Sequence, residues 1–158
     1  MEENKMNTKT QKQIKDEVNK AYLAEGYKPE SAQLQTIERK TVNSSKEVYE
    51  LLQSFKNENQ EHFVTILLNS RNQVIDFKAL FIGSLDASIF HPREIFKYAV
   101  LNSTAKIIVA HNHPSGNLEP SQNDIQMTRK IREAGEIMGI SVVDSVIISE
   151  EGYRSIIY

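Results

Sequence analysis

The stretch IIVAHNHPSGNLEPSQND, residues 107–124, leads from a short apolar run directly into two histidines that are separated by one residue. Such a run is typical of a buried β-strand. Because side chains alternate along a strand, His111 and His113 should point to the same side of the sheet. Pro114 should end the strand, and the loop that follows leads to a predicted helix that starts near Ser121.

Asp124 lies in the first turn of that predicted helix, where the helix dipole favours an ionised carboxylate. His111, His113 and Asp124 would form a ligand set typical of catalytic zinc, with one coordination position left for water. Water in such a site becomes a nucleophile near neutral pH. The same three ligands also suit iron(II), so the residue types leave both metals open.

A purely structural interpretation needs no metal. Ser121 and Asp124 match an ordinary helix capping box, and paired histidines can be satisfied within a core or a loop. That interpretation must explain two histidines on one face, the intervening loop and a carboxylate at a helix start as unrelated features. We therefore favour the metal site.

A catalytic zinc also needs a general base that is not one of its ligands. Glu61 opens the predicted strand EHFVTILL, residues 61–68, which should belong to the same sheet. Glu94, in HPREIF (91–96), is the alternative, although the dipole also favours a glutamate in the first turn of a helix. The pattern alone does not choose between them.

The composition is that of a folded globular protein: 158 residues, 25% charged and 39% apolar. A net charge of −2 gives no overall basic field that would attract nucleic acid. The absence of cysteine excludes disulfides, thiolate nucleophiles and cysteine-ligated zinc. We find neither a signal peptide nor an apolar run long enough to span a membrane, so we predict a cytoplasmic protein without a membrane partner.

Residues 1–43 predict a helical arm or a flexible extension, and residues 44–158 predict one domain. Within the domain, Ser44 and Glu47 form a capping box for a helix with an apolar face made by Val48, Leu51, Leu52 and Phe55. A second helix should start at Pro92, with an apolar face made by Ile95, Phe96, Ala99 and Val100. Strands are predicted at 61–70, 73–83 and 105–110, a long helix at 121–138 ending at Gly139, and a hairpin at 141–158. Helices interleaved with strands predict an α/β domain with a mixed sheet flanked by helices.

Four segments resemble the RadC family of the JAB1/MPN/JAMM metalloprotease superfamily. They are EHF (61–63), GSLDASIFHPREIF (83–96), HNHPSGNLEPSQND (111–124) and TRKIREAGEIMGI (128–140). The resemblance covers roughly residues 44–158, and the spacing of His-x-His, HPSG and S-x-x-D makes it specific. It implies an architecture similar to cytidine deaminases.

The resemblance also implies roles for individual residues. His111, His113 and Asp124 would bind zinc, and Glu61 would activate the water and shuttle its proton. Ser121 would donate a hydrogen bond to the developing oxyanion, although it could instead serve only as the helix cap.

Two features depart from the family pattern. Longer members carry an N-terminal helix-hairpin-helix region, and residues 1–43 do not read as one. The family often has Asp-His after the last helix, whereas here Asp144 is followed by Ser145. The second change lies outside the predicted ligand set, so it bears on the surroundings of the metal more than on its binding.

The leading hypothesis is a zinc hydrolase that cleaves a peptide or isopeptide-type amide in an unknown protein or peptide. One alternative is a RadC-type protein that acts in DNA repair or mobile-element biology through nucleic-acid binding. Another is an interaction module without catalysis, although such modules of the superfamily usually lose metal ligands. The sequence leaves the substrate and the oligomeric state open.

Overall fold

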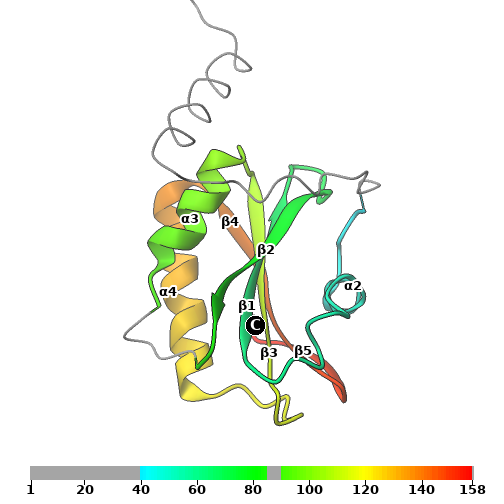
Figure 1. The fold of residues 1–158 in the computed structure, drawn as a ribbon. Helices are drawn as coiled ribbons and strands as arrows, with labels where there is room; N and C mark the ends of the chain where they lie inside the picture. Colours follow the sequence, from blue (N-terminus) through cyan, green and yellow to red (C-terminus); the bar gives the residue numbers. More distant parts are fainter. Residues whose placement is uncertain (1–39, 85–89, 158) are drawn as a thin grey trace, which may run out of the picture. The chain divides into compact units, whose positions relative to one another are not determined.

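A computed structural model describes residues 40–84 and 90–157 of the chain (Figure 1). The predicted arm, residues 1–43, lies almost entirely outside the described residues and stays a prediction. The elements in chain order are α2 (Ser45–Leu51), β1 (His62–Leu68), β2 (Val74–Ile82), α3 (Pro92–Leu101), β3 (Lys106–Asn112), α4 (Gln122–Met138), β4 (Ser141–Ser149) and β5 (Gly152–Ser155).

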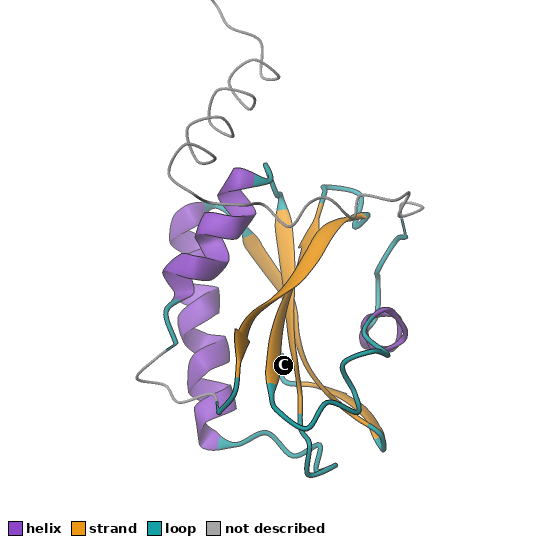
Figure 2. Ribbon diagram, in the orientation of Figure 1, coloured by secondary structure: helices purple, strands orange, loops and turns teal. Residues whose placement is uncertain are grey.

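The five strands form one mixed sheet in the order β2-β1-β3-β4-β5. β3 and β4 pair in parallel, joined by the crossover helix α4, and the other neighbours pair antiparallel. Helices α3 and α4 cover one face of the sheet and α2 lies on the other (Figures 1 and 2). The predicted α/β class, a mixed sheet flanked by helices, is confirmed.

The central strands β1 and β3 are buried along almost their whole length because helices cover both faces of the sheet. Along β3, Ile107 and Val109 belong to the core under α3 and α4, whereas Ile108 and Ala110 belong to the core under α2. The alternation therefore directs the side chain of His111 toward α4 and that of Asn112 toward α2.

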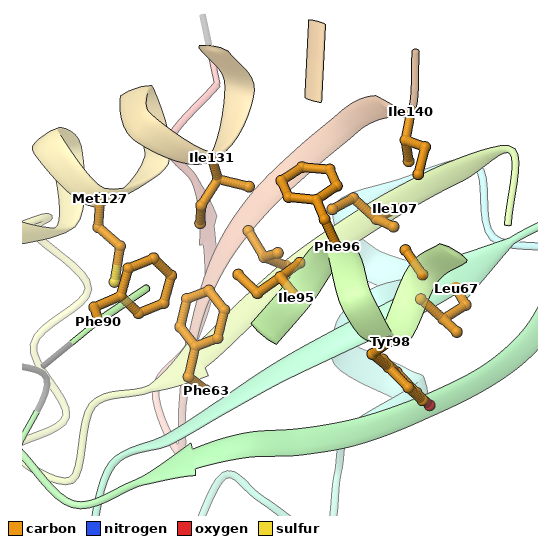
Figure 3. Packing of buried hydrophobic residues seen from close by; sticks show 12 residues of the cluster. Phe63, Leu67, Phe90, Ile95, Phe96, Tyr98, Ile107, Met127, Ile131 and Ile140 are labelled. Atoms are coloured by element: carbon orange, nitrogen blue, oxygen red, sulfur yellow. The ribbon is translucent and has the colours of Figure 1, made fainter. Parts of the chain in front are cut away.

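The larger core packs between the sheet and helices α3 and α4 (Figure 3). The rings of Phe63 and Phe90 meet edge to face, with centroids 5.0 Å apart. Ile95 of α3 and Ile131 of α4 are completely buried against them. This core holds both helices against the sheet and so fixes where α4 begins.

Helix α3 begins at Pro92 as predicted, but its apolar face differs from the prediction. Val100 was expected in the core and is 52% exposed, whereas Tyr98 is buried. Val100 follows the buried Ile95 by five residues, which turns it about 140° away from that side chain on a helix of 3.6 residues per turn. The prediction for Val100 is therefore wrong.

Helix α2 is shorter than predicted. The Ser44 hydroxyl accepts from the Glu47 N–H as expected, the Glu47 carboxylate accepts from the Asn43 N–H, and Leu52 is completely buried. The α-helix nevertheless ends at Leu51, because the Phe55 N–H donates to the Leu52 carbonyl, three residues back, and the chain turns toward β1. Phe55 still packs against the core, but from a turn and not from the helix.

Helix α4 runs for 17 residues and ends at Gly139, whose φ of 66° is the left-handed conformation expected at a helix C-terminus. Directly after it, the Ile140 N–H donates to the Gly135 carbonyl at 3.0 Å and turns the chain into β4. None of the helices in residues 40–84 and 90–157, α4 included, is long and apolar enough to span a membrane.

Gly135 marks a close approach of α4 to the chain that follows it. A Cβ atom at this position would lie 2.6 Å from the carbonyl oxygen of Ile140. Overpacking of about 1–3 kcal/mol should outweigh the gain of about 1 kcal/mol that alanine brings to a helix. We expect Gly135→Ala to lower the free energy of unfolding in urea, whereas the exposed Glu133→Ala should change it by less than about 0.5 kcal/mol. Equal stability of the two variants would contradict the close packing.

Candidate metal centre

The two histidines come from the end of β3, beside the start of α4. His111 pairs with Phe63 across the β1–β3 ladder. His113 follows the last residue of β3, and its N–H donates to the Ile148 carbonyl of β4 at 2.9 Å. The extended course therefore continues one residue past the strand and brings both imidazoles to the same side, as the spacing predicts.

Asp124 completes a cluster of three potential metal ligands whose donor atoms all lie within 4.8 Å of one another. The Nε2 atoms of His111 and His113 are 3.0 Å apart. Asp124 Oδ1 lies 3.1 Å from His111 Nε2, and Oδ2 lies 3.5 Å from His113 Nε2. Tetrahedral ligands at about 2.0–2.1 Å from zinc are separated by about 3.3 Å. The donor atoms are therefore close enough together for the three residues to hold a metal ion.

Asp124 also belongs to the capping box of α4. The Ser121 N–H donates to Asp124 Oδ2 at 2.7 Å, and the Asp124 N–H donates to Ser121 Oγ at 3.1 Å. The structural and the metal-binding interpretations of these residues are thus both compatible with the structure. The cap fixes the carboxylate through Oδ2, while Oδ1 lies beside His111 Nε2.

The hydrogen bond of His113 to the following loop selects its ligand atom. Its Nδ1 lies 2.6 Å from the carbonyl oxygen of Asn117. A carbonyl only accepts, so Nδ1 carries a proton, and the neutral imidazole would present the lone pair of Nε2 to a metal. A backbone carbonyl is a usual partner for the second nitrogen of a metal-binding histidine.

His111 is held mainly by packing. The side chain is 1% exposed, and its ring stacks on Phe63 at an interplanar angle of 16°. Its Nδ1 has no hydrogen-bond partner among the described residues. The two histidines are therefore oriented differently, one by a carbonyl and one by an aromatic ring.

A cleft of about 390 Å³ opens over this cluster. Glu61, which directly precedes β1, and Ser121, the N-cap of α4, both line this cleft. The described lining consists of Glu61, Ser84, His113, Pro114, Ser115, Asn117, Glu119, Ser121, Asn123 and Asp124. Glu94 is not among these residues; it pairs with Arg93, and its side chain is 45% exposed. The structure thus places one of the two glutamates near the cluster.

The charges in the cluster shift the pKa values of two ligands. Burial acts to raise the pKa of Asp124, but hydrogen bonds from His111 and His113 outweigh it and hold that pKa well below its usual range. The hydrogen bond to Asp124 raises the pKa of His113 despite partial burial, and the charge of Glu61 raises it further. The carboxylate is therefore ionised at neutral pH, as a metal ligand must be.

These shifts predict how pH affects the zinc-free protein. A histidine whose pKa is raised by folding stabilises the fold fully below its unfolded value of 6.5, and this contribution is lost as pH rises through the folded value. The free energy of unfolding of zinc-free protein should therefore fall as the pH rises above about 6.5. Zinc requires neutral histidine, so the stabilisation by added zinc should grow over the same range.

Urea unfolding with and without zinc at several pH values measures both trends. His113→Ala should remove most of the pH dependence of the zinc-free protein. A free energy of unfolding that rises with pH in the absence of zinc would contradict the assignment.

The side chains of Asp144 and Ser145 point to opposite faces of β4. Asp144 accepts a hydrogen bond from Ser45 of α2 at 2.8 Å, on the face opposite the cluster. Ser145 shares a buried hydrogen bond with Thr128, one helical turn after Asp124. Ser145, which stands where the family often has histidine, therefore contacts α4 beside the cluster and is not one of the three potential ligands.

Several residues around the cluster were not predicted from the sequence. Ser84 lines the cleft although it is far from the histidines in the chain. Asn117 acts through its backbone carbonyl, which no sequence pattern reveals. Asn112 contacts the backbone on both sides of Glu61. The sequence does indicate that its side chain points to the other face of the sheet from those of His111 and His113, because it lies between them on a strand.

Comparisons with known proteins show which family the chain resembles. Residues 42–157 match the family described as RadC-like JAB domain. The chain is 51% identical over 116 residues to a UPF0758 protein of Enterococcus faecalis, covering 73% of this chain and 50% of that relative. It is 45% identical over 119 residues to a UPF0758 protein of Shouchella clausii, covering 75% and 52% of the two chains. The chain thus spans about half the length of these curated relatives. The chain belongs to the RadC-like JAB domain family, within the JAB/MPN superfamily.

Proposed function

We propose that this chain is a zinc-dependent hydrolase that cleaves a peptide or isopeptide-type amide bond. One observation carries the proposal: Glu61 and Ser121 line the same cleft as His113 and Asp124. A non-ligand carboxylate and a hydroxyl beside three metal ligands are the groups that amide hydrolysis by an activated water requires.

Each group would have a distinct role. Zinc, when bound, lowers the pKa of water and polarises a carbonyl. Glu61 would accept a proton from the attacking water and then deliver it to the nitrogen of the leaving amine. Its position supports this role, because it lies two residues before Phe63, the strand partner of His111, and so faces the same side.

Ser121 can cap the helix and stabilise an oxyanion at the same time. In the capping bond its Oγ accepts a hydrogen bond from the Asp124 N–H. That bond leaves the hydroxyl proton available for donation into the cleft. The two interpretations of Ser121 are therefore compatible.

Substitution of Ser121 can separate these roles. Glycine replaces a serine cap at a cost of only a few tenths of a kcal/mol, and it has no side chain that could donate a hydrogen bond. We expect Ser121→Gly to change the melting temperature little and to lower kcat roughly 100-fold, as loss of an oxyanion donor does. Ser121→Ala should lower both, with a loss of stability of about 1 kcal/mol. Full activity in Ser121→Gly would leave the residue with a capping role alone.

The proposed activity is tested with zinc-loaded protein and two probe sets: quenched fluorescent peptides of randomised sequence, and peptides joined through a lysine side-chain amide. Cleavage should disappear on chelation and return with zinc. Zinc-loaded protein that cleaves no member of either set would count against the hydrolase. Zinc-dependent and salt-sensitive binding to DNA, measured in parallel, would then favour the nucleic-acid alternative.

A further inference from the structure

Asn112, between the two histidines, makes three hydrogen bonds to the backbone that carries Glu61. Its side chain is completely buried. Asn112 Oδ1 accepts from the His62 N–H at 2.6 Å. Its Nδ2 donates to the carbonyl oxygens of Gln60 at 2.9 Å and of Glu58 at 3.3 Å. One amide thus binds the chain on both sides of Glu61.

These bonds begin where the β1–β3 ladder stops. The last backbone pair at this end is Phe63 with His111. Beyond it, the Asn112 side chain connects β3 to residues 58–62. On the other side, the Gly83 N–H after β2 donates to the Glu61 carbonyl at 2.8 Å. The backbone of Glu61 is therefore fixed from both neighbouring strands.

We propose that Asn112 is a positioning residue that fixes Glu61 at the metal centre. The inference rests on the proposed function, in which Glu61 is the general base. Asn112 and the two histidines are consecutive in the chain at the end of β3, and their side chains alternate between the two faces of the sheet. A shift of the Glu61 backbone relative to the histidines would therefore require Asn112 to break its bonds. A displacement of about 1 Å at a reacting group can lower a rate about 100-fold.

Kinetics of Asn112→Ala test this role. We expect kcat on a cleavable probe peptide to fall roughly 100-fold, with little change in KM or in zinc affinity. Val146→Ala is the matched control: this side chain is also completely buried under α2, on β4, and should lower stability without lowering kcat. If both variants lose activity in proportion to stability, Asn112 has only a structural role.

A double-mutant cycle with Glu61→Gln tests whether Asn112 acts through the glutamate. If it does, Asn112→Ala should lower kcat little further once the carboxylate is absent. Independent, multiplicative effects of the two substitutions would overturn the proposal. Asn112→Ser, which keeps a polar group in the buried site, replaces Asn112→Ala if the latter does not fold.

Hydrogen exchange gives a readout that does not need an active enzyme. The Gly83 amide contacts Glu61 but not Asn112, so its exchange reports whether the glutamate backbone has been released. We expect at least about a 10-fold faster exchange in Asn112→Ala than in Val146→Ala at equal global stability. Unchanged exchange at Gly83 would overturn the inference even if no probe is cleaved, whereas absence of cleavage alone would count against the hydrolase.

Discussion

Glu61→Gln should lower kcat by roughly 100- to 10,000-fold, which is the range for loss of a general base. The amide keeps the shape of the side chain but cannot accept the proton from water. Glu61 is not part of the three-ligand cluster, so the variant should bind zinc as the unmodified protein does. Initial rates on a cleavable peptide, with zinc content measured on the same samples, give the result.

The matched control is Glu94→Gln, the other glutamate that the sequence left open. Its side chain pairs with Arg93 in the first turn of α3 and does not line the cleft. We expect full activity in this variant. An inactive Glu94→Gln beside an active Glu61→Gln would reverse the assignment of the base.

Asp124→Asn should weaken zinc binding by more than about 100-fold, beyond the 10- to 100-fold effects typical of residues that only support the ligands. Asparagine can still accept the Ser121 N–H, so the start of α4 should remain intact. It lacks the negative charge that zinc requires from this ligand. His113→Ala should have an effect of similar size, because it removes one of only three protein ligands in the cluster.

Metal content by mass spectrometry and zinc titration against a competing chelator measure this loss. Asn123→Ala is the control, since Asn123 is exposed in the same cleft but does not belong to the ligand cluster. About one zinc per chain is expected in the unmodified protein and in the control. Iron in native protein would favour the other metal that this ligand set suits. Unchanged zinc affinity in both ligand variants would contradict the site.

The elements that the sequence predicted well depend on spacing along the chain. The apolar run before His111 predicted β3, and Ser121 with Gly139 predicted both ends of α4. These features follow from the period of two in strands and from local capping bonds. The common face of the two histidines follows from the same period.

Features that depend on contacts between distant parts of the chain could not be predicted from spacing. The choice between Glu61 and Glu94 depends on the pairing of β1 with β3, which sets Phe63 opposite His111. The exposure of Val100 depends on how α3 packs on the sheet. The end of α2 at Leu51 depends on the turn that leads toward β1.

The sequence by itself determined the fold class, the family pattern and the three potential ligands, because residues close in the chain or at regular spacing specify them. Only the tertiary structure brought Glu61 into the cleft, directed Nδ1 of His113 to the Asn117 carbonyl and placed Asn112 against residues 58–62. These contacts join segments up to about 60 residues apart or depend on loop conformation, so the packing of the sheet and not the local sequence decides them.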